Sequence, residues 1–283
     1  MAQQMQNYNK ELVVVTDKLD KAALHSIIDE NSKILAIWVQ GYIERHVCDY
    51  IAKNLSNKAF TKYSFYADDI PVGRLGMAFG ETCLDEKLQD EYFGKASETR
   101  TLIREIADPY ISPVDKLMID LDTLWDKGAI TPEMYGKRML SGIYRSIMPG
   151  GKITQHQDNL KEELPNADFI PVKDLVSNVF IEIPDDPESG GEFQVWDYSP
   201  KYHNSLSEYY NDSLSKDDHH LSDDDFKNLE NQECITIKPQ VGDLIIFNPM
   251  NIHQVTELKL GRRISSSFHI GYMGVNKQLY CWS

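Results

Sequence analysis

The stretch Lys152–Asp158 constrains this chain more than any other, because it combines a strand-like pattern with two metal-ligating side chains. It follows the turn-forming residues Pro149–Gly151, which mark the start of a strand. Side chains at alternate positions of a strand point to the same face, so His156 and Asp158 would present an imidazole and a carboxylate to one point. The stretch therefore predicts half of a metal site on a strand of a β-rich fold.

A third ligand must come from elsewhere in the chain, and His253 is the best candidate. It follows the predicted strand Asp243–Asn248. Two histidines and one carboxylate on one face of a metal leave the opposite face open, as in the non-haem Fe(II) oxygenases. A His-x-Asp triplet also arises by chance, so this hypothesis depends on support from other residues.

Arg263 and Ser265 give that support, because they share one face of a predicted strand. A guanidinium beside a hydroxyl suits one end of a dicarboxylate. A surface salt bridge is the alternative for Arg263, and Arg262 could supply it equally well; the phase with Ser265 favours Arg263. The same face continues with Ser267 and His269, and the other face carries Ile264, Ser266, Phe268 and Ile270. This alternation predicts a barrel with a polar interior whose outer face is covered by helices.

Seven short strands are predicted after Arg138, and most are separated by Pro or Gly: 141–148, 152–158, 177–183, 192–198, 234–238, 243–248 and 263–273. Many short strands with such punctuation are typical of an antiparallel double-sheet barrel. We therefore expect a mainly β fold with flanking helices, a double-stranded β-helix of the jelly-roll or cupin type.

The N-terminal half shows helical as well as strand-like sequence patterns. Its patterns predict a strand at 11–15, a helix at 17–30, a strand at 33–40, a helix at 44–55 and a mostly helical segment at 97–126, broken at Pro109 and Pro113. No glycine-rich phosphate loop accompanies the first strands, so a dinucleotide-binding fold has no support. We expect residues 1–138 to form a helical and mixed flank of the same domain, and residues 139–283 to form the jelly-roll catalytic core.

Charge and cysteine usage restrict the partners and the compartment. The net charge of −15 argues against nucleic acid or an anionic membrane as a partner, and no apolar run approaches the ~20 residues of a membrane helix. The N-terminus lacks the pattern of a signal peptide, and the four cysteines include no Cys-x-x-Cys motif. We therefore expect a reducing, cytoplasmic location and a small-molecule substrate; nothing in the pattern indicates an oligomeric state.

An acidic segment at 199–231 separates two predicted strands, and its position favours a lid over the cavity mouth, with a solvated surface loop as the alternative. Its His219–His220 pair lies among aspartates, and a solvated loop is favoured there over a second metal site. Trp196 and Tyr198 are in phase with each other, so they line the cavity as substrate contacts or simply pack. His269, on the polar face of its strand, is a further candidate for substrate contact.

At these residues the sequence resembles the Fe(II)/2-oxoglutarate-dependent oxygenase superfamily, whose pattern is His-x-Asp/Glu, a distal His and an Arg about ten residues later. Further blocks are similar to the freestanding cyanobacterial halogenases that act on indole alkaloids: Arg145–His156, Asn178–Pro184 with Glu188–Phe193, and Tyr280–Ser283. Those halogenases have Gly at the position of Asp158, which leaves an iron site for chloride. The presence of Asp158 implies hydroxylation or a related oxidation instead.

The resemblance also implies the cofactors and the reaction. Fe(II), bound by His156, Asp158 and His253, would take 2-oxoglutarate and O2 on its open face, and Arg263 would pair with the distal carboxylate of 2-oxoglutarate. Arg145 is a further candidate for co-substrate contact, with a structural ion pair as the alternative. The co-substrate would be decarboxylated to succinate while an aliphatic C–H bond of a natural-product or amino-acid-like intermediate is hydroxylated. The alternatives are a protein or peptide hydroxylase and a non-catalytic cupin-type barrel that binds a ligand or metal.

Overall fold

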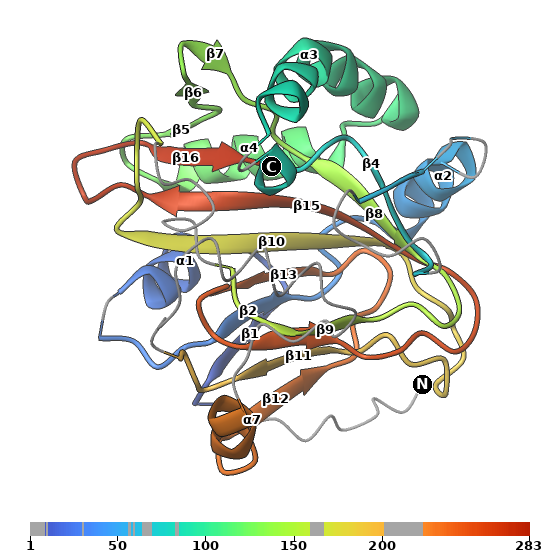
Figure 1. Ribbon diagram of the computed structural model, residues 1–283, viewed down its shortest axis with the longest axis vertical. Coiled ribbons are helices and arrows are strands. Elements are labelled where there is room, and N and C mark those ends of the chain that lie inside the picture. The colour runs from blue at the N-terminus through green and yellow to red at the C-terminus, as the bar shows by residue number, and fades with distance from the viewer. Residues whose placement is uncertain are drawn as a thin grey trace.

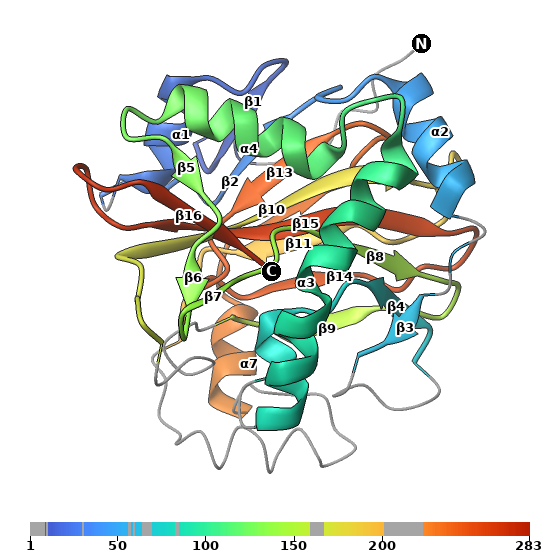
Figure 2. The same ribbon diagram turned by 90° about the horizontal axis from the view of Figure 1, so that it is seen from above.

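A computed structural model describes residues 9, 11–29, 31–55, 58, 60–63, 70–82, 85–158, 167–200 and 223–283 of the chain. Two β-sheets face each other, and four helices lie outside the larger one (Figures 1 and 2). This is the double-stranded β-helix that the sequence predicts.

The larger sheet has ten strands. Its main path is β1 (Val13–Thr16), β2 (Ala36–Val39), β13 (Leu244–Phe247), β10 (Lys173–Glu182), β15 (Arg263–Tyr272), β8 (Ile143–Ile147), β4 (Val72–Leu75) and β3 (Thr61–Lys62); β16 (Leu279–Trp282) pairs with β15, and β5 (Ala129–Ile130) pairs with β16. All pairs along this path are antiparallel except β1 with β2, and β5 pairs in parallel with β16.

The smaller sheet has four antiparallel strands in the order β12 (Cys234–Ile237), β11 (Phe193–Trp196), β14 (His253–Val255) and β9 (Ile153–His156). A separate hairpin pairs β6 (Glu133–Met134) with β7 (Lys137–Arg138). The apolar side chains between the two sheets include Phe180, Phe193 and Phe247.

The helices are α1 (Lys21–Ile28), α2 (Arg45–Leu55), the 3-10 turn η1 (Phe79–Thr82), α3 (Glu86–Ala107), α4 (Pro113–Leu124) and α7 (Asp223–Leu229). Helix α4 starts where the sequence allows it, because the Ser112 hydroxyl accepts the N–H of Asp115 and Pro113 occupies the first turn. Helix α3 begins earlier than the periodicity predicts, since Asp85 caps it and its first turns are mostly polar. No helix in the described part of the chain is long and apolar enough to cross a membrane.

The alternation predicted for residues 263–270 is confirmed. Ile264, Phe268 and Ile270 pack into the apolar cluster that α1, α2, α3 and α4 form on the outer face of the larger sheet. The odd-numbered residues of β15 therefore point between the two sheets. This phase determines which polar side chains enter the barrel.

The N-terminal half contributes strands as well as helices. Strand β2 pairs with β13, so β1 and β2 extend the same sheet that carries β10 and β15 (Figure 1). We infer that residues 1–138 and 139–283 form one domain, because strands from both halves are hydrogen-bonded to one another within a single sheet.

Seven of the strands in the described part of the chain were missed from the sequence: β3, β4, β5, β6, β7, β14 and β16. Each has only two to four residues, so too few alternations are present to show a period of two. Of the segment expected to be a lid, α7 is described, whereas residues 201–222, including His219–His220, lie outside the described residues.

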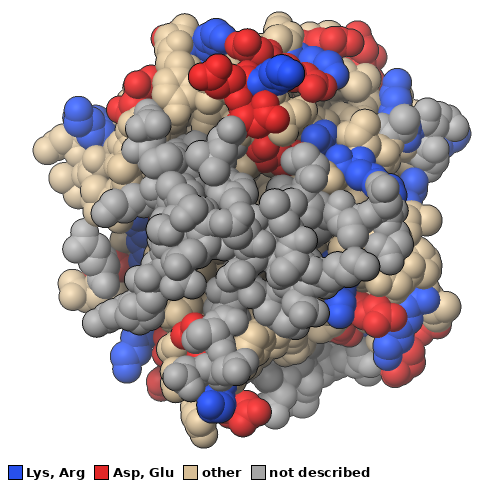
Figure 3. All heavy atoms as spheres, in the orientation of Figure 1, with Lys and Arg blue, Asp and Glu red and all other residues tan. Residues whose placement is uncertain are grey.

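Figure 3 shows basic and acidic side chains beside each other at the edge of one face of the molecule. The described residues of this face show no continuous basic patch.

Candidate metal centre

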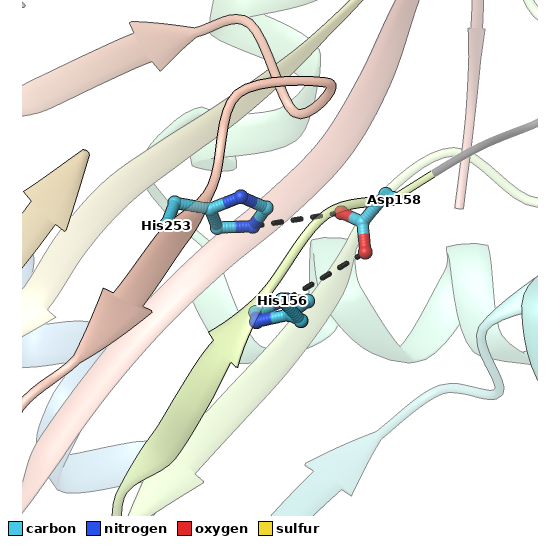
Figure 4. A group of neighbouring side chains, drawn as sticks. All are labelled: His156, Asp158 and His253. Carbon is cyan, nitrogen blue, oxygen red and sulfur yellow. Dashed lines mark ion pairs between the residues drawn. The ribbon is translucent and has the colours of Figure 1, made fainter. Parts of the chain in front are cut away.

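The smaller sheet brings two histidines together. His156 ends β9 and His253 begins β14, and the two residues are direct partners in the register of this pair. Their ring centroids are 4.1 Å apart. Asp158 follows β9, and its backbone N–H donates to the Pro249 carbonyl at 2.9 Å, which turns the chain so that the carboxylate faces both rings (Figure 4).

The three side chains form a donor set for a metal. Asp158 Oδ1 lies 3.6 Å from His156 Nε2, and Asp158 Oδ2 lies 3.7 Å from His253 Nε2. One ligand atom from each residue lies within 4.8 Å of the others. A transition metal with N and O ligands at about 2.0 to 2.2 Å fits between them after small side-chain rotations.

Backbone carbonyls hold both imidazoles in the tautomer that a metal needs. His156 Nδ1 lies 2.7 Å from the Thr154 carbonyl, and His253 Nδ1 lies 2.9 Å from the Asn251 carbonyl. A carbonyl oxygen only accepts hydrogen bonds, so each Nδ1 carries the proton and donates it. Each Nε2 lone pair is therefore directed at the common point beside Asp158, as the outer hydrogen bonds of metal-binding histidines require.

The charge states also suit a metal. Burial lowers the pKa of His253 to about 3, so this imidazole is neutral at physiological pH. Burial opposes ionisation of Asp158, but His156 and His253 outweigh it and lower the pKa of the carboxyl below its usual value. Smaller contributions come from His269 and Arg145. The set thus offers the neutral imidazole of His253 and the carboxylate of Asp158.

Arg263 lies inside the barrel at the start of β15, only 2% exposed. Its Nε has no hydrogen-bond partner among the described residues, and neither has the Oγ of Ser265, which is fully buried. The guanidinium rests on the Phe180 ring, 4.9 Å from its centroid. Burial, with a contribution from Arg145, lowers the pKa of Arg263 to about 9. A buried cation beside an unsatisfied hydroxyl is a site for an anion with oxygen acceptors.

Arg262 points the other way. Its guanidinium pairs with the Glu182 carboxylate at 2.6 Å on the outer face of the larger sheet. The structure therefore separates the two arginines as strand alternation requires, with Arg262 in the salt bridge and Arg263 in the interior.

Arg145 lies directly opposite Ser265 in the register of β8 and β15. Its Nε donates to the Tyr63 hydroxyl at 2.8 Å, and its guanidinium lies 5.5 Å from the centroid of the same ring. Arg145 thus brings a second positive charge close to Arg263.

Trp196 and Tyr198 do not join these residues. On β11, Phe193 and Val195 face the interior cluster, so Trp196 lies on the opposite face. It packs there with Leu229 and Ile252, and the Tyr198 hydroxyl donates to Asp225 in α7 at 2.8 Å. This arrangement favours packing over the cavity-lining alternative for the two residues, because the apolar face of β11 is the one that the barrel buries.

His269 does lie on the interior face, where two residues that sequence reasoning missed hold it. Its Nδ1 is 2.8 Å from Asp174 Oδ2, and its ring stacks on Trp282 at 5.3 Å with an interplanar angle of 12°. Asp174 belongs to no motif, and Trp282 lies in the block Tyr280–Ser283, which gave it no role of its own. Only the pairing of β10 and β16 with β15 brings them to His269.

Comparison with known proteins identifies the family of the chain and proteins that share its fold. The family described as carrier-protein-independent halogenase WelO5 matches residues 11–283. No curated protein matches the chain. A solved N-substituted L-amino acid dioxygenase from Burkholderia ambifaria AMMD superposes with a TM-score of 0.62 at 17% identity, covering 93% of this chain and 91% of that chain.

Two more solved structures are similar. A structure of the dioxygenase of that name in complex with alpha-KG gives a TM-score of 0.62 at 15% identity, covering 93% of this chain and 90% of that chain. An oxidoreductase of the 2OG-Fe(II) oxygenase family from Burkholderia pseudomallei gives 0.48 at 13% identity, covering 95% and 98%. At these identities the dioxygenase structures establish the shared fold.

Proposed function

The chain belongs to the carrier-protein-independent halogenase WelO5 family and is an Fe(II)/2-oxoglutarate-dependent oxygenase, and from this premise we propose that it hydroxylates an aliphatic C–H bond of a small molecule. The observation that carries the proposal is the position of the Asp158 carboxylate, 3.6 and 3.7 Å from the two histidine Nε2 atoms. With Fe(II) bound, a carboxylate at this place would take the coordination position that a halide would need.

His156, Asp158 and His253 would hold Fe(II). The fit rests on the hydrogen bonds from the two Nδ1 atoms to backbone carbonyls, which leave both Nε2 atoms as ligands. Three protein ligands on one face leave the opposite face for a co-substrate and O2. Phe247, whose ring centroid is 4.8 Å from that of His253, keeps an apolar wall beside the ligand set.

Arg263 and Ser265 would hold the distal carboxylate of 2-oxoglutarate. The fit rests on the unpartnered Arg263 Nε and Ser265 Oγ, since a carboxylate offers an acceptor for both. Arg145 adds positive charge near a dianion. When bound, Fe(II) and 2-oxoglutarate supply the oxidising power, with O2 consumed, succinate and CO2 released, and one oxygen atom delivered to the substrate.

The substrate we propose is a natural-product or amino-acid-like intermediate rather than a protein. One structural neighbour, at 17% identity, is named an N-substituted L-amino acid dioxygenase, and this name describes an enzyme of a small molecule. Arg263, Ser265 and the metal ligands are buried or half-buried between the sheets, and such a recess suits a small substrate better than a folded chain.

Halogenation is the second candidate, because the family is described as one of halogenases. It would require Asp158 to leave the position between the two Nε2 atoms. The hydrogen bond from the Asp158 N–H to the Pro249 carbonyl fixes the backbone there, so the carboxylate could leave only by rotation of its side chain.

The test uses purified protein with Fe(II), 2-oxoglutarate, O2 and chloride. We expect succinate without added substrate, and less than a tenth of it from Asp158→Ala, with Asp197→Ala as a matched control on an exposed carboxylate. A metabolite that stimulates turnover should gain the mass of one oxygen atom. A chlorinated product would overturn the proposal, and absence of succinate from the unaltered protein would contradict both candidate reactions.

A further inference from the structure

Asn178 is a buried amide on an inner strand of the larger sheet, and the proposed chemistry leaves it without a role. It lies on β10 between β13 and β15, where its direct partners are Ile245 and Ser267. The residues two positions away on either side, Val176 and Phe180, belong to the apolar cluster between the sheets, so the Asn178 side chain points between the sheets as well. The strand thus places one polar side chain within an otherwise apolar run.

Asn178 and Ser267 present unpaired polar groups to this space. Asn178 is 8% exposed and Ser267 is 5% exposed. Neither the Asn178 amide nor the Ser267 hydroxyl makes a hydrogen bond within the described part of the chain. The outer face of β10 packs against the helices through Leu175 and Val179, so the exposed part of Asn178 faces the interior. A buried amide that lacks a partner costs free energy, which a ligand with an acceptor recovers.

Along β10, Asn178 lies between the anion site and the metal ligands. On one side, the Phe180 ring carries the Arg263 guanidinium, 4.9 Å from its centroid. On the other side, the interior residue two positions before Asn178 is the direct partner of Phe247, and the centroid of the Phe247 ring lies 4.8 Å from that of His253. A ligand that reaches from the anion site to the metal ligands therefore passes Asn178.

The spacing of the neighbouring strand suits a dicarboxylate that joins the two sites. Ser265 and Ser267 are two positions apart on the interior face of β15, which is about 7 Å along a strand at ~3.3 Å per residue. An extended five-carbon dicarboxylate has a similar length. Ser265 is the direct partner of Phe180, and Ser267 is the direct partner of Asn178. A 2-oxoglutarate whose distal carboxylate lies at Ser265 thus has its 2-oxo acid end beside Asn178.

The Asn178 amide suits this end by its chemistry. An amide nitrogen donates two hydrogen bonds, whereas a carboxylate only accepts them. Ile245, its partner on β13, is apolar and cannot compete for the donor. The amide also carries no charge, so it can orient a carboxylate without adding to the positive charge that Arg145 and Arg263 bring to the interior.

Resting on the proposed function, we propose that Asn178 is a co-substrate-binding residue whose Nδ2 donates a hydrogen bond to the 2-oxo acid carboxylate of 2-oxoglutarate. The Ser267 hydroxyl is a second donor to the same end. Arg263 and Ser265 hold the distal carboxylate, so the two ends of the dianion are bound by separate pairs of residues. Asn178 then determines how the 2-oxo acid end is turned toward the metal ligands.

The experiment measures the affinity of the anaerobic Fe(II)-loaded protein for two ligands by titration calorimetry. 2-Oxoglutarate has both ends, whereas 2-oxobutyrate has the 2-oxo acid end without the distal carboxylate. Asn178→Leu keeps a side chain of similar shape and removes the donor. We expect it to weaken both ligands by a similar factor, between about 10 and 100, as for one hydrogen bond to a charged group. Arg263→Met should weaken 2-oxoglutarate alone, so the two variants separate the two ends.

Ser177→Ala is the matched control, because the Ser177 hydroxyl is buried on the opposite face of β10 and donates to the Phe268 carbonyl at 2.9 Å. It should change neither affinity. Asn178→Leu should melt no lower than the unaltered protein without ligand, since it removes an amide that has no partner. If Asn178→Leu is nevertheless poorly folded, Asn178→Asp decides: it keeps the shape, replaces the donor by a carboxylate, and should weaken both ligands at least tenfold.

Unchanged affinity for 2-oxobutyrate in the Asn178 variants overturns the inference. A loss of affinity confined to 2-oxoglutarate also overturns it, because Asn178 would then act at the distal end. An unaltered protein that binds neither ligand contradicts the proposed function and this inference with it. Binding by the unaltered protein that the Asn178 variants retain in full contradicts the inference alone.

Discussion

Replacing Arg263 by methionine tests the anion site, because it should have opposite effects on the empty protein and on its complex with 2-oxoglutarate. The pKa of Arg263 is lowered well below the ordinary value of a guanidinium, to about 9, mainly by burial. At 1.36 kcal/mol per pKa unit, the charged guanidinium lowers the stability of the ligand-free fold by up to about 5 kcal/mol. Methionine fills a similar volume without charge, so we expect the melting temperature of ligand-free Arg263→Met to rise by about 5 °C or more.

The same change should remove the partner of a buried carboxylate. Truncating one member of such a pair costs about 2 to 5 kcal/mol, which raises the dissociation constant of 2-oxoglutarate by a factor between about 30 and 5,000. Titration calorimetry of the metal-loaded protein measures this directly. Arg262→Met is the matched control, since Arg262 makes a half-exposed salt bridge with Glu182 and should change either quantity by less than about 1 kcal/mol.

The pH dependence of stability gives a further check on this reasoning. Because the folded-state pKa of Arg263, about 9, lies below that of the unfolded chain, the unfolded chain binds more protons as the pH rises above 9. The stability difference between Arg263→Met and the unaltered protein is therefore full below pH 9 and narrows above it. A lower melting temperature for Arg263→Met with unchanged affinity for 2-oxoglutarate would refute the account, and so would a larger loss of affinity in Arg262→Met.

His253→Ala should weaken Fe(II) binding at least 100-fold, measured anaerobically by competition with a chelator, whereas exposed His46→Ala should not change it. Asp243→Ala should lower the free energy of unfolding, measured in urea, by about 2 to 4 kcal/mol, because the buried Asp243 carboxylate accepts three hydrogen bonds. If the loss is no larger than that of exposed Asp197→Ala, these hydrogen bonds contribute little to stability. Trp196→Ala should cost about 3 kcal/mol of stability and leave the affinity for 2-oxoglutarate unchanged, since this ring packs against α7; a weakened affinity would return it to the cavity.

The positions of the metal ligands could be predicted from local pattern because strand alternation is a local property. His156 and Asp158 share a face by their spacing alone, and the same rule distinguishes Arg263 from Arg262. The direct pairing of His253 with His156 could not be predicted, because β14 has only three residues and its register depends on contacts distant in sequence.

Alternation shows which side chains share a face but does not show which face the barrel buries. Trp196 and Tyr198 were correctly placed in phase, yet Phe193 and Val195 supply the buried face of β11. Burial follows the apolar side here, because the smaller sheet closes over an apolar cluster at this point. Only the packing of the two sheets shows where this cluster ends and the polar interior begins.

Asp174 was beyond sequence reasoning for another reason. It precedes the part of β10 that was predicted as a strand, and its partner His269 is 95 residues away in sequence. Trp282 lies on β16, which joins the sheet through β15. Contacts of this kind are made by the fold as a whole, so no short motif records them.

The most direct test of the central claim is the anomalous diffraction of anaerobic crystals grown with Fe(II), 2-oxoglutarate and bromide, recorded at the iron and bromine edges. The account predicts one iron peak with His156 Nε2, His253 Nε2 and an Asp158 oxygen within about 2.0 to 2.3 Å, and no bromine peak bonded to it. An iron peak beside bromide, with the Asp158 carboxylate turned away from both histidines, would contradict the account and identify the site as that of a halogenase.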